Sequence, residues 1–120
     1  MLFRSVSRIR GSIERHGQSF LDKVFTPEEK VYCGDKSDPA VHLAARFAAK
    51  EAAAKALGTG IGGKFGWLDF EVVKNEDGRP LARFSPHASK LLVEKSSGGA
   101  YLSLSHLQEV ASAVVVLVGK

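Results

Sequence analysis

The amino-acid sequence predicts an α+β fold, a single domain over residues 1–120 in which helices pack on one face of a mostly antiparallel sheet. Segments with helical spacing dominate the first half of the chain, and alternating or β-branched segments dominate the second half. The sequence "NEDG" at 75–78 lies between two strand segments and favours a hairpin turn. No internal repeat or linker divides the sequence, so we expect one domain.

Two helices are expected before residue 38. Gly17 is expected to end or kink the first of them. Thr26, Pro27 and Glu29 favour the start of the second, because Thr can cap, Pro suits the first turn and Glu closes a capping box. The first helix is indicated by apolar residues at helical spacing, namely Val6, Ile9, Ile13 and Phe20.

A long Ala-rich helix is predicted over residues 39–57. The Asp38–Pro39 pair repeats the start signal. Gly58 favours a stop there, because a glycine adopts a positive φ at little cost. The residues expected to face the core form one stripe, Leu43, Phe47, Ala54 and Leu57.

Three charges on this helix have two interpretations. Lys50 falls on the apolar stripe and Glu51 lies at its edge, where a charge must be paired, reach water or serve a site. Glu51 and Lys55 also form an i,i+4 pair in the favourable orientation, worth only a few tenths of a kcal/mol on a surface. Periodicity alone leaves open whether these charges are solvated decoration or part of a site.

Strand patterns follow in the second half. The alternation over 67–74 puts Leu68, Phe70 and Val72 on one face of a first strand. The later elements expected are a partner strand at 80–84, a helix from Ser85 to Gly98, an alternating strand at 101–106 and a β-branched central strand at 110–118.

Composition limits the classes of function. The net charge of +4 favours an anionic partner without choosing among nucleic acid, phosphorylated cofactor and acidic protein. Residues 1–23 alone carry +3, from five basic and two acidic residues. The sequence has no apolar run near the ~20 residues of a membrane span. Cys33 is the single cysteine, so no intrachain disulfide can form, and we predict a cytoplasmic protein.

The loop after the long helix, "GTGIGGKFG", matches G-x-G-x-x-G and nearly matches a P-loop. Both motifs require a strand before the loop and a helix after it, and here the order is reversed. A weaker inference remains, that the glycines expose backbone N–H groups and let a ligand approach closely. His106, at the end of a predicted strand, is either a surface residue or a group that binds phosphate.

The stretch "RFAAKEAAAKALGTGIG", at 46–62, resembles the signature of the holo-acyl-carrier-protein synthases, a family of small phosphopantetheinyl transferases. The flanking segments resemble the same family: "SRIRGSIERHGQSFLDKVFTPEE" its first helices, "FEVVKNEDGRP" its hairpin, and "LSLSH" with "ASAVVVL" its last two strands. The resemblance extends from about Val6 to the end of the chain.

The resemblance implies an activity in lipid metabolism. Such enzymes transfer the phosphopantetheine arm of coenzyme A to a serine of an apo acyl carrier protein and release adenosine 3',5'-bisphosphate. Magnesium sits on the pyrophosphate, and the enzymes form homotrimers with active sites between subunits. The implied partners here are therefore coenzyme A, Mg²⁺, an acidic carrier protein and further copies of the chain, with no membrane and no nucleic acid.

The resemblance also implies roles for individual residues. Glu51 matches the magnesium ligand and helps to activate the attacking serine, and Lys55 matches the lysine near the transferring phosphate. Arg8 and Arg15 match the basic face that receives the carrier protein. The positions that match coenzyme-binding residues are Arg46, Lys50, Gly58, Thr59, Gly60, Gly62 and His106.

The start of the chain departs from the family pattern. The family opens with a strand of the type G-x-D-[IL], whose Asp is the second magnesium ligand, and that position is Leu2 here. We therefore expect the first strand and one carboxylate to be missing, with poor Mg²⁺ binding and reduced turnover. Residues 1–5, "MLFRS", are atypical, and we interpret them as a truncation or an assembly scar, which the upstream genomic DNA tests.

Two other readings remain. A small basic α+β domain that binds nucleic acid or a phosphorylated ligand fits the charge, although no aromatic pair is placed for base stacking. A degenerate transferase fold kept as a trimer-forming partner fits the missing carboxylate. Only an enzyme adds the mass of the arm to a carrier protein.

Overall fold

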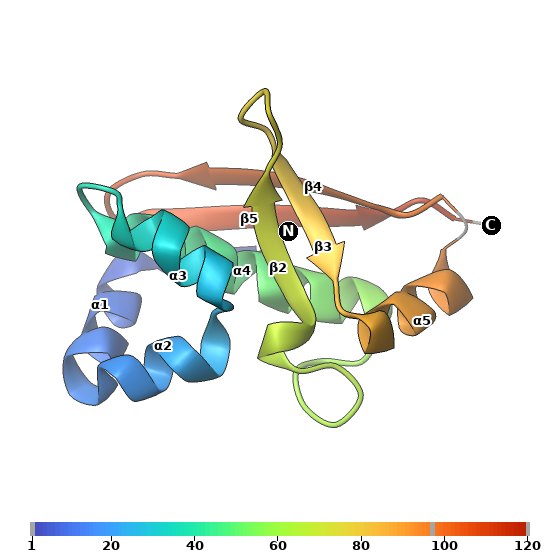
Figure 1. The fold of residues 1–120 in the computed structure, drawn as a ribbon, viewed down its shortest axis with the longest axis horizontal. Coiled ribbons are helices and arrows are strands. Elements are labelled where there is room, and N and C mark those ends of the chain that lie inside the picture. The colour runs from blue at the N-terminus through green and yellow to red at the C-terminus, as the bar shows by residue number, and fades with distance from the viewer. Residues whose placement is uncertain (1, 97, 120) are drawn as a thin grey trace.

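The structure, a computed structural model, describes residues 2–96 and 98–119. A long helix, α4, lies between a three-stranded sheet and a two-stranded hairpin (Figure 1). The sheet has the strand order β1-β5-β4, so β5 is central, as predicted, and every strand pair is antiparallel. The bounds are α4 Pro39–Leu57, β1 Leu2–Ser5, β4 Ala100–His106, β5 Val110–Leu117, and, in the hairpin, β2 Phe70–Lys74 and β3 Pro80–Phe84.

The expectation that the first strand is missing is wrong. Leu2–Ser5 forms β1, which pairs with β5 so that Leu2 lies opposite Ala113 and Ser5 opposite Val110. Strand pairing uses backbone N–H and C=O groups, so "LFRS" can form it without the family's Asp. The missing carboxylate remains missing, because a partly buried Leu2 occupies its position. Met1 lies outside the described residues.

The helix starts and stops largely follow the sequence prediction. Gly17, with φ 52°, separates α1 (Val6–His16) from α2 (Gln18–Val24). In α3 (Pro27–Gly34), the Glu29 N–H donates to Thr26 Oγ1 (3.4 Å) and the Thr26 N–H to Glu29 Oε1 (3.1 Å), which completes the predicted capping box. Gly58 ends α4 with φ 78°.

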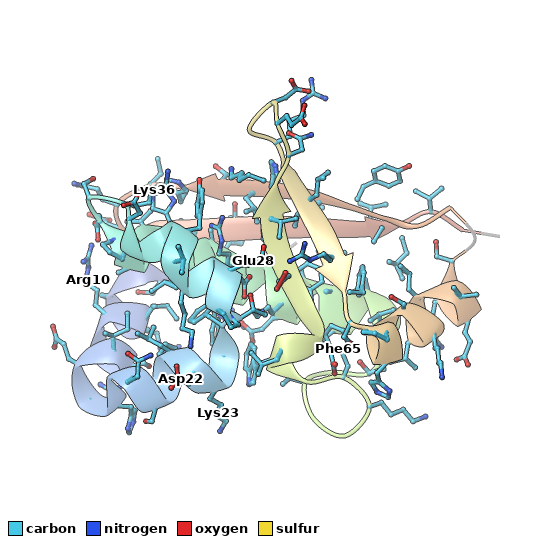
Figure 2. All side chains as sticks on the ribbon, in the orientation of Figure 1. Arg10, Asp22, Lys23, Glu28, Lys36 and Phe65 are labelled. Carbon is cyan, nitrogen blue, oxygen red and sulfur yellow. The ribbon has the colours of Figure 1, made fainter. Side chains whose placement is uncertain are left out.

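One cap differs from its prediction. Asp38 precedes α4 but makes no side-chain cap; its carboxylate instead accepts a hydrogen bond from Arg10 (2.6 Å). Arg10 belongs to α1 and, like Asp22 and Lys23 of α2, lies at the end of the molecule formed by these two helices (Figure 2). The Asp38–Pro39 signal therefore locates the start of α4 correctly, but the Asp38 side chain binds Arg10 of α1 instead of capping α4.

The first predicted strand begins later than expected. Residues Trp67–Asp69 form a short 3₁₀ helix, because the Asp69 carboxylate accepts from the Gly66 N–H (2.8 Å) and the Ser85 hydroxyl (2.7 Å). Leu68 is half exposed as a result, whereas Phe70 and Val72 of β2 are buried. The last helix, α5 (Pro86–Lys95), starts at the Ser85 cap as predicted and stops before Gly98.

The core follows α4 on nearly all of its faces. A single buried stripe was expected, but α4 packs on β5 and β1 on one side and on α3 and β2 on the other. Alanines make this double contact possible, because small side chains let both layers approach the helix closely. Buried alanines occupy every turn of α4 from Ala40 to Ala54. Charged side chains on α4 therefore need partners inside the protein or a route to its surface.

Candidate functional site

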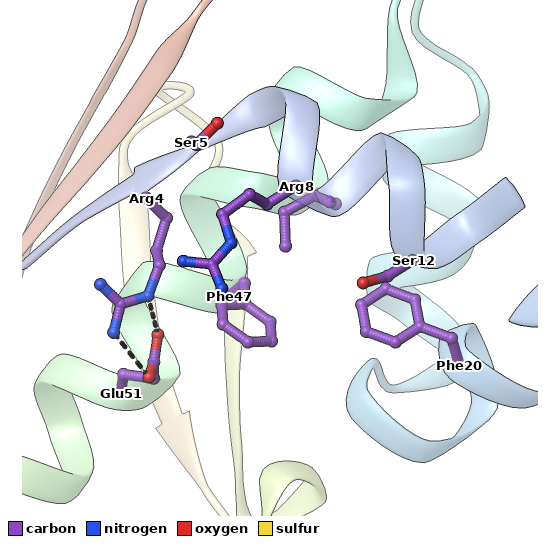
Figure 3. A pocket seen from close by; sticks show the side chains of 8 residues that line it. Arg4, Ser5, Arg8, Ser12, Phe20, Phe47 and Glu51 are labelled. Atoms are coloured by element: carbon purple, nitrogen blue, oxygen red, sulfur yellow. Dashed lines mark hydrogen bonds and ion pairs between the residues drawn. The ribbon is translucent and has the colours of Figure 1, made fainter. Parts of the chain in front are cut away.

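A hollow of about 400 Å³ opens between β1, α1 and α4 (Figure 3). Polar groups from three elements meet there: Arg4 from β1, Arg8 and Ser12 from α1, and Glu51 from α4. Ile9, Phe20 and Phe47 supply apolar lining, and Ser5 completes the set. The predicted residues Glu51 and Arg8, which are 43 positions apart, are thus brought into one site.

Glu51 is held by a residue that the sequence analysis did not single out. Arg4 donates from Nε to Glu51 Oε1 (2.5 Å) and from Nη2 to Oε2 (2.8 Å), a two-pronged ion pair that Figure 3 shows spanning from β1 to α4. This hydrogen bonding raises the pKa of Arg4. Glu51 therefore pairs with Arg4, and not with Lys55, the partner that the i,i+4 spacing suggested.

The hollow is net positive. Glu51 is the only carboxylate among the residues that line it, against the guanidinium groups of Arg4 and Arg8. Figure 3 shows Arg8 pointing from α1 toward the hollow, which Phe47 also lines. Phe47 is fixed from behind by stacking on Trp67, with ring centroids 4.7 Å apart. The arrangement therefore combines an anion-attracting charge with a rigid apolar floor.

Lys55 and Arg15 lie outside this lining. Lys55 is exposed one turn along α4 from Glu51, on the same helix face. Arg15 is exposed on α1, seven residues from Arg8, with its guanidinium lying back over Gly11. Arg8 and Arg15 thus extend a basic strip along α1 away from the hollow.

The glycine loop is only partly as expected. Gly58 donates its N–H to the Lys55 carbonyl (3.0 Å), and Thr59 and Gly60 donate theirs to the Ala54 carbonyl (3.1 and 3.3 Å). Gly62 donates to the Phe65 carbonyl (2.8 Å). The expectation that the glycines expose their N–H groups is therefore not met at Gly58, Gly60 and Gly62, since these groups cap α4 or close the loop. The glycines do have open space beside them, because an added Cβ at Gly58, Gly60 or Gly62 would meet no atom within 4 Å.

A second cluster of cationic and aromatic side chains forms around Tyr32. The Arg46 guanidinium lies over the Tyr32 ring at 4.5 Å and the Lys36 ammonium at 4.4 Å. The His42 ring contacts both Tyr32 and His106, with centroids 6.2 and 4.9 Å away. Burial lowers the pKa of His42, and the neighbouring charges of His106 and Arg46 lower it further.

Arg46 and His106 are therefore brought together, as two predicted coenzyme positions. Arg46 is almost fully buried and gives one hydrogen bond to the His42 carbonyl (3.3 Å), and within the described part of the chain its Nε has no partner. An unsatisfied buried guanidinium is costly unless a ligand completes it. Arg46 and Glu51 are five positions apart on α4, or about 140° around the helix, so the cluster and the hollow lie on different sides of it.

Lys50 is placed away from both groups. Its side chain is fully buried, pairs with Glu29 Oε1 (2.8 Å), and donates to the carbonyls of Trp67 (2.8 Å) and Phe70. Burial lowers the pKa of Lys50, and the Glu29 carboxylate opposes that shift. Because its buried ammonium is held by Glu29 and two backbone carbonyls, Lys50 holds α4 against α3 and β2, and the coenzyme contact that the resemblance implied stays a prediction.

The side chains present do not fit a resident Mg²⁺. This cation prefers several oxygen ligands and usually one or two carboxylates. Glu51 is the one carboxylate of the hollow and is neutralised by Arg4, with Arg8 beside it. In residues 2–96 and 98–119, no group of three or more His, Cys, Asp and Glu side chains could hold a metal.

No helix in the described part of the chain is long and apolar enough to cross a membrane.

Sequence reasoning missed Arg4, Tyr32 and Lys36, and it gave Glu29 a role in the capping box only. None belongs to the signature stretch. Arg4, Tyr32 and Glu29 each contact a residue of α4 that is distant in sequence, and Lys36 lies over the Tyr32 ring. One signal was available: the basic excess of residues 1–23 includes Arg4, and the alternation of β1 puts it on the same side as Leu2.

Residues 4–115 match the family model described as the 4'-phosphopantetheinyl transferase superfamily, and the chain belongs to that family. Curated relatives narrow the comparison to one kind of transferase. A holo-[acyl-carrier-protein] synthase of Carboxydothermus hydrogenoformans is 50% identical over 112 residues, covering 93% of this chain and 89% of that protein. The synthase of Protochlamydia amoebophila is 42% identical over 111 residues, covering 92% and 88%.

Solved structures agree with this placement. The holo-[acyl-carrier-protein] synthase of Neisseria meningitidis superposes with a TM-score of 0.87 at 36% identity, covering 97% of this chain and 93% of the other. The Helicobacter pylori synthase, solved in complex with coenzyme A, gives 0.84 at 33% identity, covering 96% and 95%. The predicted α+β fold is confirmed by these superpositions.

Proposed function

We propose that this chain transfers the 4'-phosphopantetheine arm of coenzyme A to a serine of an apo acyl carrier protein, releasing adenosine 3',5'-bisphosphate. The observation that carries the proposal is the match to the transferase family over residues 4–115. The positive hollow beside Glu51 and the cationic cluster around Tyr32 support a phosphorylated substrate. Relatives named for this reaction favour it over nucleic-acid binding.

In the proposed step, the serine oxygen forms a bond to the phosphorus that carries the pantetheine arm. The bond from that phosphorus to the bridging oxygen of the pyrophosphate breaks, and the leaving group takes that oxygen. Glu51 receives the serine proton through a water, since it is the carboxylate that lines the hollow. Lys55, one turn along the same helix face, offsets negative charge as it develops on the phosphate oxygens.

Coenzyme binding is assigned to the cluster and the loop. Arg46 and His106 contact a phosphate, because Arg46 Nε is buried without a partner among the described residues and His106 lies exposed beside His42. The open space at Gly58–Gly62 leaves room for the coenzyme, with Thr59 in the same loop. Mg²⁺ enters this proposal with the pyrophosphate oxygens of the coenzyme rather than as a resident ion, and we derive no step through it.

The acidic carrier protein is proposed to dock on Arg8 and Arg15. Both are exposed on α1, and neither forms an ion pair within residues 2–96 and 98–119. Arg8→Glu and Arg15→Glu are expected to slow association with the carrier about tenfold or more at low salt, because charge steering acts on the association rate. Stopped-flow binding measures this, with Lys90→Glu on α5 as the matched control. Equal rates in all three variants would contradict the docking face.

Assembly into a homotrimer is also proposed. The outer face of the sheet is uncharged, since alternation puts Ser, Val, Phe and Tyr side chains there. Phe3, Tyr101 and Val116 are each more than half exposed on it. Because the cluster and the hollow lie on different sides of α4, a coenzyme that contacts both would bridge two copies. Light scattering should give about three times the 12.9 kDa chain mass; a monomer at micromolar concentration would exclude this.

Mass spectrometry of apo carrier protein after incubation with this chain, coenzyme A and Mg²⁺ tests the activity. Addition of the arm's mass supports the enzyme, and binding without mass addition supports the alternative of a degenerate partner.

We place the reaction in the cytoplasm on the basis of Cys33, the single cysteine. Its thiol is buried, burial raises its pKa to about 11, and it needs no oxidising compartment.

A further inference from the structure

The start of the chain reaches into the candidate site. Arg4 is the third residue of β1, and its side chain crosses to α4, where both of its contacting nitrogens meet Glu51 oxygens at 2.5 and 2.8 Å. A third nitrogen, Nη1, donates to the Phe3 carbonyl (2.7 Å), which fixes the guanidinium plane. Each carboxylate oxygen therefore already accepts from Arg4, and a cation that approaches Glu51 meets the positive guanidinium beside it.

The surroundings favour the ion pair over a metal. Arg4 and Glu51 are each about one-third exposed or less, so water screens the pair only partly. Arg8 adds a second positive charge to the same hollow, which repels a divalent cation as well. Two-pronged guanidinium–carboxylate pairs are also among the stronger and more directional ion pairs in proteins.

We propose that Arg4 acts as an internal cation that closes Glu51 to divalent metal, so that in this chain the hollow accepts an anion first and a metal only when Arg4 is displaced. The inference rests on the proposed role of Glu51 but concerns metal access, not catalysis. It assigns to β1 a direct contact with the site, in addition to its place at the sheet edge. An anionic phosphate that draws Arg4 away would free Glu51 in the same event.

Direct metal binding tests the inference. Mn²⁺, which shares the oxygen preference of Mg²⁺, is titrated into the protein and the free ion is followed by electron paramagnetic resonance. Arg4→Met is expected to bind Mn²⁺ about tenfold more tightly than the unaltered chain. The double variant Arg4→Met/Glu51→Gln should lose that gain, which assigns the bound ion to Glu51.

Arg10→Met is the matched control. Arg10 also pairs with one carboxylate, Asp38, but on the exposed outside of α1. Arg10→Met removes one positive charge, as Arg4→Met does, so any gain in Mn²⁺ affinity from net charge alone appears in both of these variants. Circular dichroism checks that each variant is folded.

Two results would overturn the inference: Arg4→Met and Arg10→Met binding Mn²⁺ equally, or a gain in Arg4→Met that survives Glu51→Gln. Arm transfer is measured on the same samples and answers a different question. Absence of transfer in every variant, with the expected Mn²⁺ pattern, would reject the proposed function and leave the metal-excluding pair standing.

Discussion

Glu51→Gln is expected to lower the rate of arm transfer to the carrier protein by about a hundredfold or more. A general base contributes roughly 10²–10⁴ in rate, and no second carboxylate among the residues that line the hollow can replace it. Coenzyme A affinity should not weaken, because the variant leaves Arg4 and Arg8 in place and removes a negative charge. Steady-state kinetics should therefore show a fall in kcat with no rise in KM for coenzyme A.

Glu71→Gln is the control for this experiment. Glu71 also pairs with an arginine, Arg83, and is likewise partly buried, but it lies on β2, away from the hollow. Its loss should leave kcat within about twofold of the unaltered chain. If Glu51→Gln and Glu71→Gln have the same small effect, Glu51 does not take the serine proton, and the base must be sought on another subunit or on the substrate.

The sequence predicted local structure well because its signals are local. The capping box of Thr26 and Glu29, the stop at Gly58 and the hairpin turn at 75–78 depend on residues within a few positions of each other. The boundary at Trp67–Asp69 was missed because alternation continues through it, while the deciding contact of Asp69 comes from Ser85, sixteen positions later.

The site was predicted less completely, for a related reason. Glu51, Arg8, Arg46 and His106 were singled out through the family resemblance, but what each side chain contacts depends on how elements pack. Arg4 is 47 positions from Glu51 in the sequence, yet its side chain forms an ion pair with the Glu51 carboxylate. The glycine loop looked like a set of free N–H donors, yet the N–H groups of Gly58 and Gly60 complete the C-terminus of α4 and that of Gly62 closes the loop. Lys50 looked like a ligand group, yet its partner is Glu29.

That last pair yields the largest expected effect on stability. Glu29 and Lys50 are both fully buried, and the Glu29 carboxylate also accepts from the N–H groups of Thr26 (3.1 Å) and Val72 (3.0 Å). The ion pair thus joins the start of α3, the middle of α4 and strand β2. Lys50→Met leaves a buried carboxylate without its counter-charge, and breaking such a pair costs about 3–5 kcal/mol. Total stabilities of about 5–15 kcal/mol make this a large loss.

Urea unfolding of four chains separates the charge from the packing. Lys50→Met alone should lose most, and Lys50→Met/Glu29→Gln should recover part of that loss, because the amide carries no charge to strand in the core. Arg10→Met, which breaks an exposed pair, should change the midpoint little. If Lys50→Met is as stable as the unaltered chain yet binds coenzyme A poorly, Lys50 is a ligand contact after all. If coenzyme binding fails only where unfolding begins, Lys50 supports the site through α4.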